Sequence, residues 1–199
     1  MAASIHKRLL AAIIAIAAGA AHPAVPKLSS DLPISLEAQS SEVSPHNMVF
    51  RKVKITQGTM SVSADQAQAT GLDFENSQWV FRGNVRIAME GGELTSDQAD
   101  ITFAKKLLST ALITGKPASF EQRIVKTGRL AQGRADVIDY DVTRGVVRLS
   151  KNAWLSDGQR EISGESLTYS VAEQRVMASS AEQGSQRVHI TITPPPQKP

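Results

Sequence analysis

Apolar and polar residues alternate at every second position along much of this chain. From Trp79 to Met89 the odd-numbered positions are largely apolar, whereas the even-numbered positions other than Val80 are polar or small. A period of two predicts a half-buried β-strand. Gly91-Gly92 follows as a turn that tolerates positive φ, and a second alternating run ends at Phe103. Residues 79–103 are therefore predicted to form a β-hairpin.

The same unit recurs further along the chain. Phe81–Ile87 aligns with Leu149–Leu155, and at the same spacing Leu94 aligns with Ile162. A repeat of one supersecondary unit buries its apolar face only when several copies stack. We therefore predict an all-β fold built from repeated antiparallel hairpins.

A small residue followed by an acid marks the middle of the repeated strands. In the clearest copy, Leu94 and Ser96 are even-numbered, whereas Ala99 and Ile101 are odd-numbered, so the inward face changes across Asp97. A bulge or corner has this effect on the alternation. The strands are predicted to bend there, which rolls the sheet into a trough. The other copies of this step are Ala64-Asp65, Ala135-Asp136 and Gly164-Glu165.

The folded domain is predicted to span residues 31–193. Pro33–Glu37 alternates and begins with proline, which suits an edge strand, and Val188–Ile192 is a final alternating strand. Arg123–Gln132 is the longest polar interruption and is predicted to be an exposed loop. Residues 194–199 are rich in proline, which cannot extend a β-ladder, and are predicted to form a disordered tail.

The first residues have the three parts of a secretory signal peptide. Residues 1–21 combine a basic start, an apolar run from Leu9 to Ala17 and a group of small residues. The apolar run is shorter than the roughly 20 residues that a membrane-spanning helix needs. Residues 22–30 contain two prolines and are predicted to be a flexible lead-in. We expect a cleaved signal peptide and an exported protein; a retained anchor is the alternative.

Composition and charge narrow the possible functions. The chain contains no cysteine, so disulfides and thiolate metal sites are excluded. Its net charge is +3, from 22 Lys and Arg against 19 Asp and Glu. Without Lys7 and Arg8 of the predicted signal peptide the balance is 20 against 19, or +1. A charge this close to zero gives no electrostatic basis for nucleic-acid binding.

Catalytic and metal-binding patterns are not found in the sequence. There is no nucleophile elbow, phosphate loop or dinucleotide motif, and the four histidines lack ligand spacing. We expect no enzymatic activity, no cofactor and no metal. Asp136, Asp139 and Asp141 form an acidic cluster, but Asp139 and Asp141 are predicted to lie on the outward face of a strand. The loose basic group of Lys126, Arg129 and Arg134 is predicted to be solvated.

Stacked hairpins would bring one set of apolar side chains onto a continuous inner surface. The patterning leaves two interpretations of this surface open, a packed sandwich core and a groove for an apolar ligand. The residues predicted to line it are Phe81, Val85, Ile87, Ile101, Phe103, Phe120, Ile138, Tyr140, Leu149, Leu155, Leu167 and Tyr169.

An ordered series of motifs resembles the LptA/OstA-like family of periplasmic lipopolysaccharide-transport bridge proteins. The resemblance covers about residues 31–193. The motifs that carry it are Pro33–Glu37, Val53–Met60 followed by Ser63-Ala64-Asp65, Gly83-Asn84-Val85, Gly115–Phe120, Gly133–Tyr140, Val147–Ala153 and Glu173–Ala178.

The resemblance implies a twisted, V-shaped β-jelly roll whose groove shields the lipid A acyl chains of lipopolysaccharide. It also implies head-to-tail self-association through edge strands, between an inner-membrane export complex and an outer-membrane translocon. The residues expected at these edges are Ile34, Leu36, Val188, Ile190 and Ile192. Two further functions stay open: an inner-membrane-anchored adaptor of the same pathway, and a structural periplasmic β-solenoid without lipid.

Two features depart from the family pattern. Thr70–Val80 resembles an insertion of about one hairpin, so that Trp79 is expected to belong to a local feature. Lys151 stands where the family often has glycine, which implies a charge near the groove.

Overall fold

In a computed structural model the chain is described over most of the predicted domain. The predicted signal peptide, the lead-in and the Pro-rich tail lie outside the described residues. The described ranges are 32–44, 47–72, 76–104, 107–123, 128–141, 143–170, 175–180 and 187–193.

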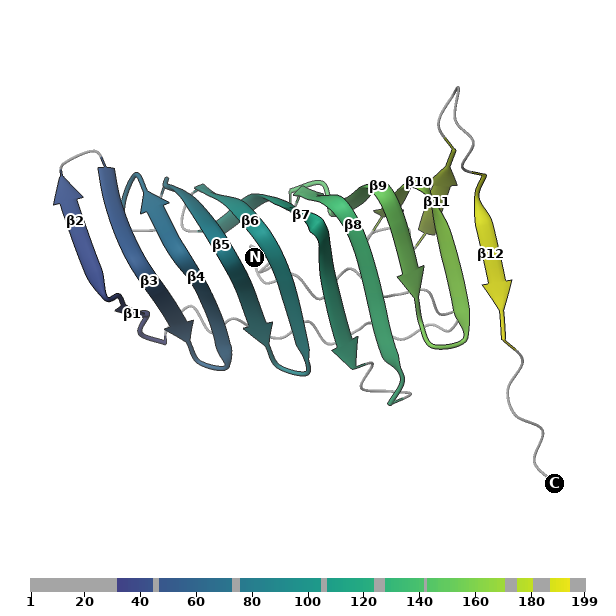
Figure 1. The fold of residues 1–199 in the computed structure, drawn as a ribbon, viewed down its shortest axis with the longest axis horizontal. Helices are drawn as coiled ribbons and strands as arrows, with labels where there is room; N and C mark the ends of the chain where they lie inside the picture. The colour runs from purple at the N-terminus through teal and green to yellow at the C-terminus, as the bar shows by residue number, and fades with distance from the viewer. Residues whose placement is uncertain are drawn as a thin grey trace, which may run out of the picture.

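The described residues form one antiparallel sheet of 12 strands, which confirms the prediction of an all-β fold (Figure 1). Most strands pair with their neighbours in sequence, so the sheet is a meander from β3 to β11. At one end β1 and β2 both pair with β3, and at the other end β11 and β12 both pair with β10. The strands are β1 Ser35–Glu37, β2 Ser40–Ser44, β3 Asn47–Gln57, β4 Met60–Ala69, β5 Gln78–Met89, β6 Gly92–Ala104, β7 Leu107–Arg123, β8 Leu130–Asp141, β9 Val146–Ser156, β10 Arg160–Ser170, β11 Arg175–Ser179 and β12 His189–Ile192.

The long strands bend where the small-acid step predicted a bend. In β6, Leu94 and Ser96 are buried, and burial then resumes at Ala99. The register between β5 and β6 shifts at the same level, between Arg82 and Val85. The same change of face occurs at the steps in β4, β8 and β10. Each bend divides its strand into two limbs. Limb A is the half of each long strand next to the β3–β4, β5–β6, β7–β8 and β9–β10 turns. Limb B is the other half, next to the β4–β5, β6–β7, β8–β9 and β10–β11 connections.

Hydrogen bonds between neighbouring strands hold the bend. Asp65 accepts a hydrogen bond from Lys52 Nζ at 2.7 Å and one from Asn84 Nδ2 at 2.6 Å. Lys52 and Asn84 both have positive φ, a conformation that costs energy for residues other than glycine. Gly83 also has positive φ, and a Cβ there would lie 2.7 Å from Asp65 Oδ2. The acid of the step therefore stabilises the strained backbone on both adjacent strands.

The same device recurs towards the C-terminal end of the sheet. Asp136 accepts a hydrogen bond from Asn152 Nδ2 at 3.0 Å, and both Lys151 and Asn152 have positive φ. Lys151 is exposed at this bend, whereas the neighbouring inward residues Leu149 and Ala153 are buried. The Lys151 side chain is therefore turned to solvent at the bend rather than into the interior.

The expected extra hairpin at Thr70–Val80 does not occur among the described residues of this segment. β4 ends at Ala69, β5 begins at Gln78, and Trp79 lies within β5, while residues 73–75 lie outside the described ranges. The Trp79 indole is 1% exposed and stacks between Phe50 and Phe81, with ring centroids 6.1 and 5.9 Å apart. Trp79 therefore belongs to the shared core. The predicted loop at Arg123–Gln132 is shorter than expected, because β7 continues to Arg123 and β8 begins at Leu130.

Asp65 makes the fold sensitive to acid. The hydrogen bond from Lys52 and the one from Asn84 lower the pKa of the Asp65 carboxyl below its usual value. Their contribution to stability is therefore complete above the unfolded-state pKa of about 4 and disappears as pH falls through the lower folded-state pKa. We expect Asp65→Asn to lower the thermal unfolding midpoint at neutral pH and to reduce the further loss in acid, both measured by circular dichroism.

Asp97→Asn provides a matched control, because Asp97 is the exposed acid at the equivalent step of β6 and no hydrogen bond like those from Lys52 and Asn84 is seen at it in the described part of the chain. An equal loss of stability in the two variants would contradict the role of the Asp65 hydrogen bonds.

Gly133 on β8 is required by the side chains that face it. A Cβ there would overlap two ring carbons of Phe120 and lie 2.7 Å from Leu155 Cδ2. We expect Gly133→Ala to displace the ring and to lower the free energy of unfolding by roughly 1–3 kcal/mol, measured by urea denaturation. Gln132→Ala, at a partly exposed neighbour, should change it by less than about 0.5 kcal/mol. Similar values for the two variants would show that Phe120 has room to move.

Candidate functional site

The apolar interior between the two limbs brings together the predicted lining residues. All belong to or pack against one core cluster, and all are buried except Ile101 and Phe103, which are partly buried near the end of β6. Limb A contributes Val85, Ile87, Phe120 and Leu155; limb B contributes the other lining residues, which are Phe81, Ile101, Phe103, Ile138, Tyr140, Leu149, Leu167 and Tyr169.

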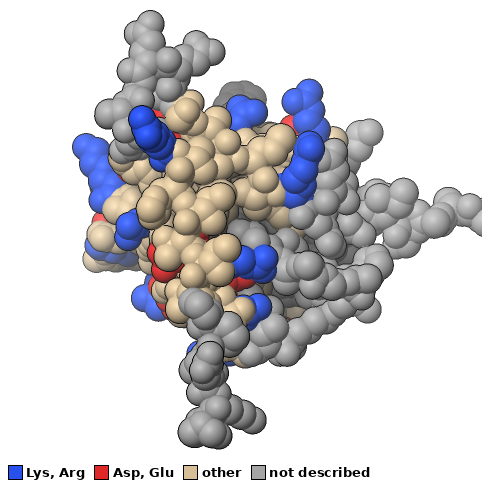
Figure 2. Space-filling view, turned by 90° about the vertical axis from the view of Figure 1, so that its right-hand side faces the viewer, with Lys and Arg blue, Asp and Glu red and all other residues tan. Residues whose placement is uncertain are grey.

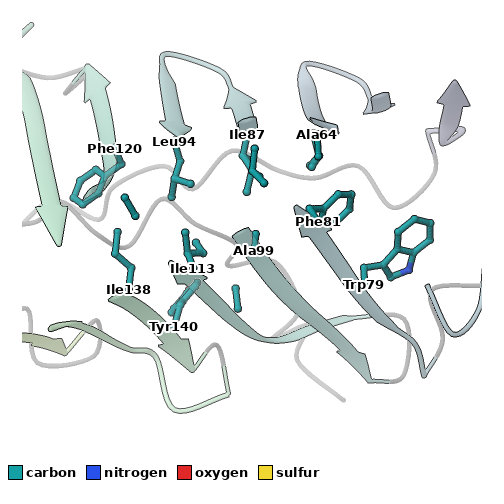
Figure 3. Close-up of a cluster of buried hydrophobic side chains, with 14 of the residues drawn as sticks. Ala64, Trp79, Phe81, Ile87, Leu94, Ala99, Ile113, Phe120, Ile138 and Tyr140 are labelled. Atoms are coloured by element: carbon teal, nitrogen blue, oxygen red, sulfur yellow. The ribbon is translucent and has the colours of Figure 1, made fainter. Parts of the chain in front are cut away.

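The two limbs meet through these side chains. Figure 3 shows Phe120, Leu94 and Ile87 on one side of the interior, facing Ile138, Ile113, Ala99 and Phe81 on the other. Alternation on each limb points one face inwards, and the bend brings the two inward faces together. The interior is therefore lined by apolar side chains from β3 to β10.

Sequence reasoning missed several interior residues. Phe50 and Trp79 lie at positions of the alternation that point inwards. Trp79 was nevertheless left out of the predicted lining residues, because it was assigned to the supposed insertion. Ile113 follows a segment whose alternation is weak, so its inward direction is clear only from its pairing with Ile138 on β8. Leu94 was recognised as part of the repeat, and its side chain is 0% exposed.

Burial varies along the interior. The inward side chains of Ile138 on β8, Leu149 on β9 and Leu167 on β10 are completely buried. The inward residues of the terminal strands are only partly buried, namely Leu36 on β1 and Val176 and Ala178 on β11, as are Met60 and Ile162 on limb A. The interior between the long strands is thus filled by the protein's own side chains, whereas the inward side chains of the terminal strands are more accessible.

In the described ranges, the buried side chains of the interior are almost all apolar. Among the described residues the only buried carboxylate is that of Asp157, in the β9–β10 turn. Burial raises the pKa of this carboxyl, but hydrogen bonds from the backbone N–H groups of Arg160 and Gln159 and from the Arg160 guanidinium bring the pKa below its usual value. Asp157 therefore holds the turn in its ionised form.

The charged clusters noted in the sequence have structural partners. Asp136 binds Asn152, and Asp141 accepts a hydrogen bond from the backbone N–H of Arg144 at 2.9 Å. Asp139 is exposed, as predicted for the outward face. Within the described part of the chain, no group of three or more His, Asp or Glu residues is arranged to hold a metal ion.

The basic group is also tied to neighbouring side chains. The Arg134 guanidinium lies 4.9 Å from the centroid of the Trp154 ring, which donates a hydrogen bond to Glu161 at 3.3 Å. Arg129 donates a hydrogen bond to Gln159. Lys126 lies outside the described residues.

The predicted edge residues lie at the two ends of the sheet. Ile34 is 43% exposed beside β1, while Val188, Ile190 and Ile192 are 37%, 60% and 68% exposed at β12. Leu36 is half-buried against the core. Figure 2 faces the C-terminal end and shows a mostly uncharged surface with Lys and Arg side chains around it. Both ends therefore expose apolar side chains beside unpaired strand edges.

A search for membrane-spanning helices over the described ranges found none of sufficient length and hydropathy. The predicted signal peptide is outside those ranges.

Similar proteins were found by sequence and by structure. The chain is 26% identical over 168 residues to the lipopolysaccharide export system protein LptA of Escherichia coli K12, covering 83% of this chain and 88% of that protein. It is 29% identical over 128 residues to LptA of Haemophilus influenzae, covering 62% and 72%, respectively.

The fold is similar to that of LptH, the LptA-homologous periplasmic component of the lipopolysaccharide transport device from Pseudomonas aeruginosa. The TM-score is 0.54 at 22% sequence identity, covering 82% of this chain and 96% of that chain. The family described as LptA/(LptD N-terminal domain) LPS transport protein matches residues 66–175, which is more than half of the chain. The chain therefore belongs to this family of lipopolysaccharide transport proteins, whose members are transport components rather than enzymes.

Proposed function

We propose that this chain is a periplasmic lipopolysaccharide-binding protein. Its interior shields lipid A acyl chains, and copies joined head to tail bridge an inner-membrane export complex and an outer-membrane translocon. The observation that carries the proposal is the continuous apolar interior between the limbs, with more accessible side chains at both ends. Family membership supports the cargo, and the sequence pattern of residues 1–21 supports the location.

The cost of exposing acyl chains to water explains why such an interior is useful. Each methylene exposed to water costs roughly 0.8 kcal/mol, so an acyl chain of about a dozen carbons costs about 10 kcal/mol. Moving an acyl chain from one apolar interior to a similar one placed end to end with it changes its free energy little. Net movement then requires an energy source elsewhere in the pathway.

Lipid can enter a filled interior if the limbs separate. The strand pairings among the described residues join limb A to limb A and limb B to limb B. The limbs are therefore connected to each other by the bends and by side-chain packing. Separating the two limbs breaks apolar contacts between side chains but no backbone hydrogen bond between strands. Bound acyl chains replace the lost apolar contacts.

Photocrosslinking tests the location of the lipid. A photoreactive amino acid at Phe103, which is partly buried on the inner face, should form adducts with added lipopolysaccharide. The same substitution at Tyr140 should also do so, whereas Arg86, on the exposed face of β5, is the matched outward control. Circular dichroism would verify that each variant is folded. Equal labelling at inward and outward positions would rule out the interior as the lipid site.

Complete burial of Ile138, Leu149 and Leu167 also favours an alternative, a structural β-solenoid with a dry core. A dry core predicts the same thermal unfolding midpoint with and without lipopolysaccharide. A lipid-binding interior predicts a midpoint that rises with lipopolysaccharide concentration, because the ligand stabilises the state that binds it.

A further inference from the structure

Two connections of limb A pack together at one corner of the sheet. β7 ends at Arg123, β8 begins at Leu130, and the β9–β10 turn follows Ser156; these strand ends lie next to each other at the lower edge of the sheet in Figure 1. A Cβ built on Gly158 would lie 3.5 Å from the carbonyl oxygen of Leu130 and 3.8 Å from Arg129 Cβ. Arg129 therefore packs on the β9–β10 turn.

Three arginines are held at this corner of the limb A rim. Arg129 donates a hydrogen bond to Gln159, and Arg123 Nη1 donates one at 3.1 Å to the backbone carbonyl of the residue before Arg129. Arg160 follows Gln159, and its Nη2 lies 2.9 Å from Asp157 Oδ2. These contacts connect the ends of neighbouring strands. We call Arg123, Arg129 and Arg160 the basic corner.

Two of these arginines stand at inward positions of the alternation. On β8 the inward residues Gly133 and Ala131 are buried, and Arg129 is two positions further towards the rim. On β10 Ile162 packs against the core, and Arg160 is the next inward position towards the rim. Successive inward positions are about 7 Å apart along a strand. The apolar inner face of limb A therefore ends at cationic residues.

Positive charge exceeds negative charge at the basic corner. Its three arginines surround one acid, the buried Asp157, which balances one of them. The β5–β6 end of the same rim has Arg86 against Glu90 and Glu93, and Gln57–Met60 at the β3–β4 turn contains no charged residue. An anion at the limb A rim is therefore attracted to the end formed by β7 to β10.

Two further acids flank the basic corner on the outer face. Glu121 on β7 and Glu161 on β10 are exposed, at positions that alternate with the inward ones. Glu161 accepts a hydrogen bond from the Trp154 indole at 3.3 Å, and the Arg134 guanidinium lies 4.9 Å from the centroid of that ring. Both acids thus lie on the side of the sheet away from the interior.

A cationic rim beside an apolar wall suits an amphiphile with an anionic head. Guanidinium groups bind phosphate oxygens by charge-assisted and often bidentate hydrogen bonds. Each guanidinium has five N–H donors, so an arginine that holds a turn can also bind an anion. A phosphate with several acceptor oxygens can contact more than one arginine. Acyl chains joined to it would lie against Phe120, Leu155 and Ile162 on the inner face of limb A.

We propose that the basic corner binds a phosphate group of the lipopolysaccharide head while the acyl chains occupy the interior. The proposal rests on the lipid binding of the proposed function and adds the polar part of that site. It fixes the orientation of the lipid, because the head is held at the limb A rim between β7 and β10.

Charge removal at the basic corner tests the site. The double variant Arg123→Gln/Arg129→Gln removes two charges, whereas Arg160 is kept because it binds Asp157 in the β9–β10 turn. Affinity is measured from the rise of the thermal unfolding midpoint with lipopolysaccharide concentration, for the intact lipid and for the same lipid after dephosphorylation. The double variant should bind intact lipopolysaccharide roughly tenfold more weakly, because two exposed charge contacts are lost. It should bind the dephosphorylated lipid as the unaltered protein does.

Two further double variants separate phosphate binding from general charge and from folding. Arg86→Gln/Arg148→Gln removes two exposed arginines away from the basic corner and should leave the affinity within about twofold. Arg123→Lys/Arg129→Lys keeps both charges without the planar guanidinium and should recover part of the lost affinity. High salt should weaken binding of the intact lipid more in the unaltered protein than in the Gln variant. Circular dichroism verifies that each variant is folded.

Each outcome decides one point. A loss confined to the intact lipid and to the basic corner supports the proposal. Unchanged affinity of the Gln variant, an equal loss for both lipids, or an equal loss in the Arg86 and Arg148 variant overturns the phosphate site and leaves lipid binding standing. No midpoint rise of the unaltered protein with either lipid overturns the proposed function as well.

Inorganic phosphate alone is the remaining arm of the experiment. It should leave the midpoint of the lipid-free protein nearly unchanged, because the acyl chains supply most of the binding free energy. A rise as large as that with lipopolysaccharide, absent from the Gln variant, would identify a site for the phosphate ion and overturn the assignment to the lipid head.

Discussion

The bend in the middle of the long strands is the constraint on which the rest of the structure depends. A regular strand sends successive side chains to opposite faces, so a change of direction needs an irregular step that resets the alternation. Here the step combines a small residue and an acid on one strand with positive-φ residues on its neighbours. Hydrogen bonds such as that from Lys52 to Asp65 offset the cost of this backbone geometry.

Because of the bend, different interactions hold the strands together within a limb and hold the two limbs to each other. Backbone hydrogen bonds run from strand to strand within each limb and hold the length of the sheet together. In the described part of the chain, the bends and the packing of apolar side chains join one limb to the other, and these side chains fill the interior. In the proposed function, the sheet stays intact along its axis while side-chain contacts between the limbs are exchanged for contacts with acyl chains. Rigidity of the sheet and access to its interior are therefore compatible.

The ends of the sheet follow from the same bend. Because each outer long strand is bent, its free edge is covered by two short strands rather than one, and these strands remain exposed on their outer side. Exposed edges normally promote aggregation.

Local alternation in the sequence was sufficient to determine the β-strands, the bend at Asp97 and the inward direction of residues such as Phe81 and Leu149. These properties depend on neighbours a few positions apart, and period-two patterning reports them directly. Only the tertiary structure decided that Asp65 binds both Lys52 and Asn84, that Trp79 stacks between Phe50 and Phe81, and that Lys151 faces solvent. Those outcomes depend on which strands become neighbours and on how the limbs fold together, and local periodicity carries no information about such distant contacts.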